Sequence, residues 1–215
     1  MQPNIRNEQP QDHRTVEELT RDAFWNLYFP GCDEHYLVHI MRDHPDFIPE
    51  MAFVAELDGK IVGNIMFTKS SLMDEAGGKL DTITFGPVCV HPDYQGRGVG
   101  PALIRHSIDL ARKNDVNAIA ILGHPRNYVK YGFVSSRDLL VSDAEGRYPF
   151  GQLVLELKAG VLSTNPVARK LHISSLFEQL TEERVAEFDR TFPEKEKSET
   201  ATQVEFGIAV RAYLD

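Results

Sequence analysis

A glycine-rich turn between a β-rich run and a helical run constrains the fold of this chain more than any other feature. The hexapeptide QGRGVG, residues 95–100, follows TITFGPVCVHPDY and precedes PALIRHSIDLARKND. Glycines in such a turn let backbone amides approach a ligand closely, and the first turn of a helix presents unpaired N–H groups and a positive dipole end. The sequence therefore predicts a strand, an anion-binding turn and a helix, with phosphate as the expected anion.

A strand, two helices and three antiparallel strands are expected before this turn. Apolar side chains recur every three or four residues from Val16 to Leu27, the spacing of an amphipathic helix. Asp58-Gly59 joins two β-rich runs and favours a type I′ hairpin turn. The expected elements are a strand at residues 4–8, helices at 11–28 and 31–44, and strands at 51–57, 60–73 and 80–90.

After the turn, the sequence predicts a helix, a parallel strand and a shorter β-rich segment. Val99, Leu103 and Leu110 mark a helix packed on the sheet, and the apolar run NAIAILG, residues 117–123, indicates a strand buried on both faces. The crossover through the helix makes this strand parallel to the one before the turn. A short helix at 124–131 and strands at 132–136 and 152–158 follow.

The character of the chain changes near residue 160. Residues 178–199 carry eight acidic and four basic side chains, and VEFGIAVRAYL, residues 204–214, is typical of a strand. We therefore expect an α/β domain at residues 1–160. Residues 161–215 are expected to form an extension of one or two helices and a strand, packed on the same domain.

Composition places the chain among globular proteins and restricts its partners. Its 215 residues are 42% hydrophobic, enough for a full core, and its formal net charge of -9 disfavours nucleic-acid binding. No apolar run approaches the ~20 residues that span a bilayer, and the N-terminus has no signal-peptide core. Cys32 and Cys89 lie far apart, which favours free thiols in a reducing compartment over a disulfide. We expect a cytoplasmic protein that binds neither nucleic acid nor membrane.

Two of the three common phosphate loops do not fit this turn. A P-loop needs Lys and then Ser or Thr after its last glycine, where this chain has Pro101 and Ala102. A dinucleotide fingerprint needs a third glycine where Pro101 stands and a βαβ opening, whereas antiparallel hairpins precede this loop. The third form is Gln or Arg, x, x, Gly, x, Gly or Ala, which Gln95, Gly98 and Gly100 fill.

This loop, the preceding VCVHPDY and the order of expected elements resemble the GNAT superfamily of acyl-CoA-dependent N-acetyltransferases over residues 4–158. The later GHPRNYVKYGF, residues 123–133, is most similar to an uncharacterised bacterial subfamily with a Gly-x-Pro, aromatic, Gly-Phe signature. The resemblance implies the GNAT fold, an α/β fold with a mixed sheet, and acetyl-CoA as cosubstrate. Pro101 departs from many members because it removes a backbone donor, although proline suits the first turn of a helix.

The resemblance also implies where the cosubstrate binds. Gly86-Pro87 interrupts the strand before the loop, and a bulge there would free backbone amides for the pantetheine arm and the acetyl carbonyl. Arg97, Arg126 and Lys130 are candidates to contact the CoA phosphates, with ordinary solvated basic residues as the alternative. The full expected cofactor site is Val88, Cys89, Val90, Gln95, Gly96, Arg97, Gly98, Val99, Gly100, Pro101, Arg126 and Tyr128.

Acetyl transfer to an amine needs an amide donor for the oxyanion, a neutral amine and a proton for the leaving thiolate. Tyr128, four residues before Gly132, stands where many GNAT enzymes have the tyrosine that protonates the thiolate; packing against the cofactor is its alternative role. The base stays open among Glu56, His124 and Asp81.

The segment around residue 35 fits either a metal site or part of the acceptor cleft. Cys32, His35 and His39 have the spacing of metal ligands, but no fourth ligand is evident, so we expect no metal and expect these residues to line the acceptor cleft or its rim. Nearby aromatic side chains are candidates for the acceptor pocket or a core stripe: Phe24, Trp25, Tyr28 and Phe29.

These features predict a cytoplasmic acetyl-CoA-dependent N-acetyltransferase that modifies a primary amine of a small molecule or peptide by direct transfer. Cys89 on the cofactor strand leaves a covalent route as an alternative. A second alternative is a catalytically silent acyl-CoA-binding regulatory module whose C-terminal extension contacts a partner. The extension is also a candidate contact of a homodimer.

Overall fold

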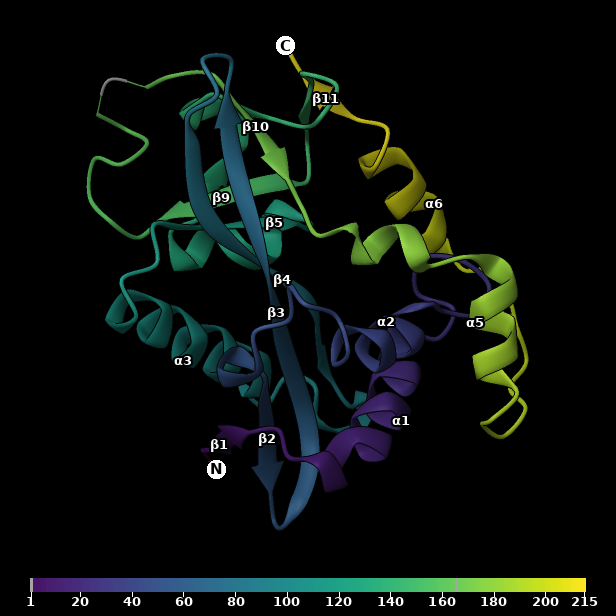
Figure 1. Ribbon diagram of the computed structural model, residues 1–215. Coiled ribbons are helices and arrows are strands. Elements are labelled where there is room, and N and C mark those ends of the chain that lie inside the picture. The colour runs from purple at the N-terminus through teal and green to yellow at the C-terminus, as the bar shows by residue number, and fades with distance from the viewer. Residues whose placement is uncertain (1, 165) are drawn as a thin grey trace. The chain divides into compact units, whose positions relative to one another are not determined.

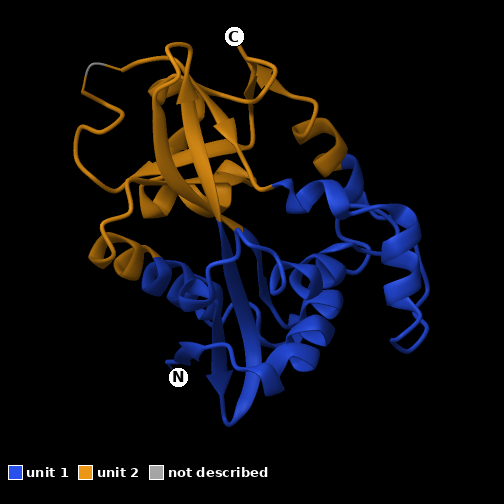
Figure 2. Cartoon of the chain, in the orientation of Figure 1, with its two compact units in different colours: residues 1–68, 86–107, 175–204 blue, residues 69–85, 108–174, 205–215 orange. Residues whose placement is uncertain are grey.

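The structure of the protein, a computed structural model, describes residues 2–164 and 166–215 (Figure 1). The chain forms two compact units (Figure 2). Unit 1 comprises residues 1–68, 86–107 and 175–204, and unit 2 comprises residues 69–85, 108–174 and 205–215. Four elements contribute residues to both units: β3 (Lys60–Asp74), β4 (Lys79–Val90), α3 (Val99–Lys113) and α6 (Ala201–Ala209).

Unit 1 carries the first hairpin and the helices that follow the first strand. β1 (Asn4–Asn7) pairs antiparallel with β2 (Phe53–Leu57), which pairs antiparallel with β3. Asp58 and Gly59 between β2 and β3 have φ values of 52° and 75°, the left-handed values that a type I′ turn requires at both central residues. Unit 1 also contains α1 (His13–Phe24), α2 (Glu34–Met41), α5 (Glu182–Asp189) and 3-10 turns at Pro10–Asp12, Pro49–Met51, Pro92–Tyr94 and Ser175–Gln179.

Two apolar clusters hold the helices of unit 1 against its strands. The larger one joins α1, α2, β2, β3 and the C-terminal segment through Val16, Leu37, Val38, Met41, Ala52, Val54, Met66 and Leu176. The smaller one, here called the Cys89 cluster, consists of Leu19, Phe24, Cys32 and Cys89, with Ala23, Trp25, Leu27, Tyr28 and Ile61 packed against it. Burial of these apolar side chains is the main force that fixes α1 and its connection to α2 beside β4.

Helix α3 approaches β3 closely at a glycine. A Cβ atom on Gly63 would lie 2.8 Å from Val99 and 3.0 Å from Leu103, closer than side chains normally pack. The absence of a side chain at this position therefore lets the first turns of α3 settle on the strand. This contact fixes the start of the helix that follows the glycine-rich turn.

Unit 2 contains the parallel strand pair that the sequence predicts. β5 (Ala118–Leu122) pairs in parallel with β4 at Ile83 and Thr84 and antiparallel with β9 (Gln152–Glu156). The remaining strands of this unit are β6 (Val134–Ser135), β7 (Val141–Ser142), β8 (Tyr148–Pro149), β10 (Arg169–His172) and β11 (Tyr213–Leu214). Helix α4 (Pro125–Tyr128) and 3-10 turns at Val129–Tyr131 and Ser136–Leu139 follow β5. Its core consists of Leu72, Ala118, Ala120, Leu139, Val141, Val154, Leu162 and Leu171.

The sheet is mixed, as the fold class requires. Within the described residues, the strands form one nine-stranded sheet in the order β1-β2-β3-β4-β5-β9-β6, with β10 beside β3 and β7. The strand, two helices, three strands, helix and parallel strand expected from the sequence all occur in that order. The prediction of an α/β fold with a mixed sheet is therefore confirmed.

The expectation of a strand over residues 204–214 is wrong. Residues 201–209 form α6, and only Tyr213–Leu214 is a strand, paired with β8 in a separate two-stranded sheet. Alternating apolar residues in this segment suggested a strand, but the first turn of the helix is fixed instead by tertiary hydrogen bonds. Thr202 Oγ1 donates to the Leu27 carbonyl oxygen over 2.9 Å and Gln203 Nε2 donates to the Asn26 carbonyl oxygen over 3.0 Å. Strand β10 was not expected at all, because RKLH carries no strand pattern of its own.

A bilayer-spanning helix is absent from the part of the chain that the structure describes. No helix there combines the length and the hydropathy that crossing a membrane requires.

Candidate active site

The glycine-rich turn adopts a backbone that only glycine takes without strain. Gly96 and Gly98 have φ values of 74° and 83°, in the left-handed region. A Cβ atom at either position would meet no atom of the described residues within 4 Å, so the space beside both glycines is open in that part of the chain. Helix α3 begins at Val99, directly after the turn, and the N–H groups in the first turn of a helix have no intrahelical partner and favour an anion. The turn is therefore shaped to accept a phosphate-sized anion.

Side chains of the turn tie it to the end of β4. Gln95 Nε2 donates to the Val90 carbonyl oxygen over 3.2 Å, and Arg97 Nη2 donates to the Asp93 carbonyl oxygen over 2.9 Å. The Arg97 guanidinium lies 4.9 Å from the centre of the Tyr94 ring, a cation–π contact. Both contacts leave Arg97 exposed with free donors on its guanidinium. Pro101 occupies the first turn of α3, where its missing N–H costs no helical hydrogen bond.

Strand β4 is longer than the segment of it that pairs with β5. The residue pairs of that ladder are Ile83 with Ile119 and Thr84 with Ala120, whereas β4 runs on to Val90. Val88 and Val90 are half-buried and Cys89 is buried. Val88, Cys89 and Val90 therefore lie outside the described residue pairs of the ladder with β5, while the bulge expected at Gly86-Pro87 stays a prediction.

The Cys89 thiol is enclosed and protonated. Its Sγ lies 3.6 Å from Thr20 Oγ1, and its side chain belongs to the Cys89 cluster. Burial raises the pKa of Cys89 to about 12. Since the thiolate is the nucleophilic form, this environment argues against a covalent acyl-cysteine route.

Glu56 is held in an ion pair at the edge of the sheet. Arg6 Nη2 lies 2.7 Å from Glu56 Oε1, and Asn4 Nδ2 donates to Oε2 over 3.1 Å. The hydrogen bond from Arg6 lowers the pKa of Glu56, and the one from Asn4 lowers it further. A carboxylate stabilised in its charged form is a weak proton acceptor. Asp81, the other carboxylate considered, is exposed and pairs with Lys79 at 2.7 Å.

Three expected site residues lie on α4 and its N-cap in unit 2. His124 caps the helix, because its Nδ1 accepts a hydrogen bond from the Arg126 backbone N–H over 3.2 Å. Arg126 is exposed. The Tyr128 ring is buried against Phe85 and Phe133, with centroid distances of 5.6 and 6.0 Å.

A glycine makes room for the Tyr128 ring. A Cβ atom on Gly123 would lie 2.5 Å from Tyr128 Cε2, which explains why the first position of the GHPRNY segment has no side chain. Gly132 has a φ of 93°, so the residue that ends the tyrosine turn also needs glycine. The Gly-x-Pro and Gly-Phe elements of the sequence signature thus fix the position of Tyr128 within unit 2.

The cysteine and histidines considered as metal ligands point to different partners. His35 Nδ1 lies 3.4 Å from Cys32 Sγ, and His35 Nε2 lies 3.2 Å from Asp189 Oδ1 without hydrogen-bond geometry. His39 Nδ1 instead lies 2.9 Å from Glu17 Oε1. Across residues 2–164 and 166–215, no three His, Cys, Asp or Glu side chains converge to hold a metal ion. His35 joins α2 to α5 in the interior of unit 1.

The aromatic side chains of the α1–α2 connection divide between core and surface. Phe24 is buried in the Cys89 cluster, with its ring centroid 5.8 Å from that of Tyr28. Trp25 and Tyr28 are half-buried at the edge of this cluster, and Phe29 is 40% exposed. The core alternative therefore describes Phe24, while Trp25 and Tyr28 lie at the edge of the core and Phe29 is exposed.

Glu34 is a candidate base that the sequence analysis missed. It opens α2, is half-buried, and its Oε2 accepts a hydrogen bond from the Asp33 backbone N–H over 3.3 Å. Burial, and after it the charge of Asp33, raise the pKa of Glu34 to about 8. Burial also raises the pKa of Tyr28 and Cys89, and the charge of Glu34 raises each further. The Glu34 carboxyl thus lies within electrostatic reach of the strand that carries the expected acyl-binding amides.

A known protein family matches more than half of this chain. The model of the Acetyltransferase (GNAT) family matches residues 17–133, more than half of the chain. The chain belongs to the GNAT family of acetyltransferases, which confirms the resemblance and the enzyme class predicted from the sequence.

Two relatives from Escherichia coli K12 are uncharacterised N-acetyltransferases. YjhQ is 38% identical over 105 residues, which are 49% of this chain and 58% of YjhQ. YhbS is 29% identical over 130 residues, which are 60% of this chain and 72% of YhbS. The chain therefore matches less than two thirds of YjhQ.

Solved structures share the fold. Escherichia coli YhbS in complex with CoA superposes with a TM-score of 0.70 at 24% identity, covering 84% of this chain and 94% of that chain. A GNAT family acetyltransferase from Brucella melitensis in complex with acetyl-CoA gives a TM-score of 0.61 at 24% identity, covering 81% and 97%.

Proposed function

We propose that this chain transfers the acetyl group of acetyl-CoA to a primary amine of a small molecule or peptide by direct transfer. The observation that carries the proposal is the turn at residues 95–100, with two left-handed glycines, open space beside both and a helix that begins at Val99. Membership of the GNAT family supports it, as do the CoA and acetyl-CoA bound in the two proteins of similar fold.

The proposed cosubstrate site follows the chain from β4 into α3. Backbone amides of Gly96, Gly98, Val99 and Gly100 bind the pyrophosphate, while Pro101 has no N–H to contribute. Arg97 and Arg126 are exposed and supply charge to the phosphates. Val88, Cys89 and Val90 pair through their backbones with the pantetheine arm and the acetyl carbonyl. Gln95 holds the turn to Val90, and this hydrogen bond keeps the two parts of the site in register.

Acid and base roles are assigned to Tyr128 and Glu34. Acetyl-CoA supplies the activated acetyl group as a thioester. Tyr128 donates the proton that the departing thiolate needs, since a phenol held in place acts by proximity. Glu34 removes the proton from the ammonium group of the acceptor, and we prefer it to Glu56 and His124. Glu56 is ion-paired with Arg6, and His124 Nδ1 already accepts the Arg126 N–H.

Residues 161–215 are proposed to extend the acetyltransferase domain of residues 1–160. Contacts between α5 and α1 support this assignment for the middle of the extension: Arg21 Nε lies 2.7 Å from Asp189 Oδ1. Leu176 is fully buried in the larger cluster of unit 1. The extension thus contributes core side chains to the same unit as α1 and α2.

The test is calorimetric titration of acetyl-CoA and of CoA into the purified protein, followed by a thiol-release screen across classes of amine. Micromolar binding with thiol release for one class is the expected result and names the acceptor type. Binding without release for any amine would favour the alternative, an acyl-CoA-binding regulatory module. Absence of binding would overturn the assignment of the turn at residues 95–100.

A further inference from the structure

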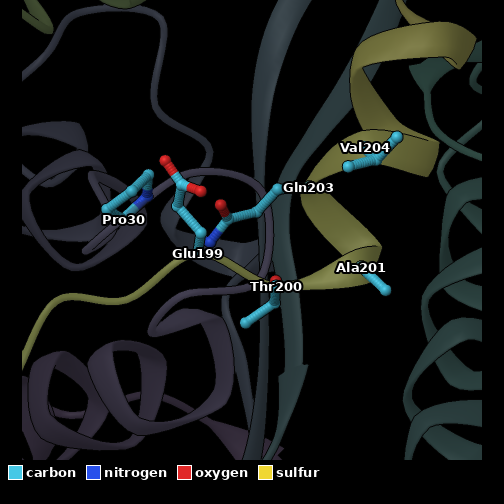
Figure 3. A pocket seen from close by; sticks show the side chains of 6 residues that line it. All are labelled: Pro30, Glu199, Thr200, Ala201, Gln203 and Val204. Atoms are coloured by element: carbon cyan, nitrogen blue, oxygen red, sulfur yellow. The ribbon is translucent and has the colours of Figure 1, made fainter.

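A cavity of about 540 Å³ lies in unit 1 beside the connection between α1 and α2 (Figure 3). Pro30 of that connection lines one side, and the remaining lining residues come from the segment that enters α6: Glu199, Thr200, Ala201, Gln203 and Val204. Figure 3 draws the Glu199 carboxylate between Pro30 and Gln203. A space of this size accommodates a small organic group.

Hydrogen bonds between segments far apart in sequence hold the walls of the cavity in place. Thr200 Oγ1 and Gln203 Nε2 each donate to the Asn26 carbonyl oxygen over 3.0 Å. Thr202 Oγ1 donates to the Leu27 carbonyl oxygen over 2.9 Å. The cavity is therefore formed before any ligand arrives, which reduces the entropy lost on binding. The hydrogen-bonding side chains of Thr200 and Gln203 are already engaged in this framework.

Glu199 is the charged member of the lining, and its side chain is exposed to solvent at the mouth of the pocket. Within the part of the chain that the structure describes, no hydrogen bond or ion pair engages this carboxylate. The neighbouring lysines are directed elsewhere: Lys195 pairs with Asp22, and Lys197 lies along Gly31. A carboxylate beside Pro30, in a pocket that Ala201 and Val204 also line, favours a cation with an alkyl stem, because the charge and the stem each find a complementary surface.

The connection between α1 and α2 contributes both Pro30 to the cavity and side chains to the Cys89 cluster. Tyr28 precedes Pro30 by two residues, and both Tyr28 and Cys32 pack in the Cys89 cluster. We propose, as an inference that rests on the proposed function, that the cavity binds a second positive charge of the acceptor with Glu199 as its counter-ion. The enzyme then prefers diamines and other amines that carry a distal cation.

The experiment compares cadaverine with pentylamine, which has the same five-carbon chain but lacks the second charge. Calorimetric titration of each amine into the protein without cosubstrate measures the cavity directly. We expect cadaverine to bind more tightly than pentylamine, and Glu199→Gln to weaken cadaverine binding about threefold to fivefold, the range of an exposed ion pair. Glu199→Lys should remove the preference altogether. The matched control is Glu194→Gln, which removes the same charge from the same segment outside the cavity lining.

The outcomes separate this inference from the proposed function. Cadaverine binding that depends on Glu199 supports the cation site even if no amine releases thiol from acetyl-CoA, in which case the acetyltransferase proposal fails alone. Equal binding of the two amines, or equal losses in Glu199→Gln and Glu194→Gln, overturns the cation site whether or not thiol is released. Thermal unfolding of each variant distinguishes a lost site from a misfolded chain.

Discussion

At the scale of single residues, the reaction is expected to depend on the ionisation of Glu34. Burial raises the pKa of Glu34 to about 8, and the base acts only after it loses its proton, so kcat/KM should rise with pH through that range. Glu34→Gln should lower kcat/KM about 100-fold and remove this limb of the profile. The deprotonation of the amine itself affects wild type and variant alike. Glu56→Gln is the matched control, and a limb near pH 8 that persists in Glu34→Gln would contradict the assignment.

Tyr128 is expected to affect rate more than affinity. Tyr128→Phe keeps the ring that packs against Phe85 and Phe133 and removes only the hydroxyl. We expect kcat to fall about 10-fold to 100-fold, with little change in the Kd of acetyl-CoA measured by calorimetry. Tyr131→Phe serves as the comparison three residues away. Equal losses of kcat and of affinity in Tyr128→Phe would indicate a packing role.

The glycine turn could be predicted from the sequence because the backbone at Gly96 and Gly98 has φ values of 74° and 83°. Glycine adopts such left-handed values without strain, so the residue type itself indicates the conformation. The sequence pattern did not find Glu34, because an acidic residue at the start of a helix is the ordinary complement of the helix dipole. Burial raises the pKa of Glu34 and the charge of the preceding residue, Asp33, raises it further; the burial depends on how the chain packs, which the local sequence does not reveal. Glu56 was singled out by its place at a strand end, and its partner Arg6 becomes visible only through the register of β1 with β2.

At the scale of elements, the packing of α2 against α5 predicts a pH dependence of stability. Burial lowers the pKa of His35 to about 4, below its ordinary 6.5. The unfolded chain then binds more protons than the folded chain between those values, so stability is full above pH 6.5 and falls as pH decreases. The expected slope is about 1.4 kcal/mol per pH unit in this window. Glu34 contributes the opposite sign above pH 4.5, because its folded pKa is raised.

The contribution of His35 is therefore measured as a difference between two proteins. Denaturant unfolding of wild type and His35→Gln at a series of pH values between 4 and 7 gives two stability curves, in which Glu34 and the other carboxyl groups act equally. The gap between the curves should narrow as the pH falls. A constant gap would mean that His35 does not titrate in this window, and that its contacts with Cys32 and Phe188 alone determine its effect.

Helices and strands could be predicted where a segment has a clear periodicity of apolar residues. They could not be predicted where contacts with distant segments determine the secondary structure. α1, α3, β2 to β5 and β9 follow from apolar spacing and from the Asp58-Gly59 turn. Residues 204–214 alternate like a strand, yet Thr202 and Gln203 bind carbonyl groups of the α1–α2 connection and begin a helix. β10 is a strand because it pairs with β3 and β7. The sequence of Arg169–His172 has no local pattern that would reveal this pairing.

At the scale of the whole molecule, the net charge of -9 should attract acceptors according to their own charge. Cadaverine carries two positive charges near neutral pH and pentylamine carries one, so the attraction is larger for cadaverine. The Debye length falls from about 30 Å at 0.01 M salt to about 8 Å at 0.15 M, which screens the field of the protein without removing a close contact in a cavity. We expect kcat/KM for cadaverine to decrease more steeply with salt than kcat/KM for pentylamine, with acetyl-CoA saturating throughout. In Glu199→Gln most of that difference in slope should remain, because eight of the nine net negative charges are still present. If the difference disappears in this variant, the preference for dications comes from the cavity alone, and the charge of the rest of the molecule has no part in it.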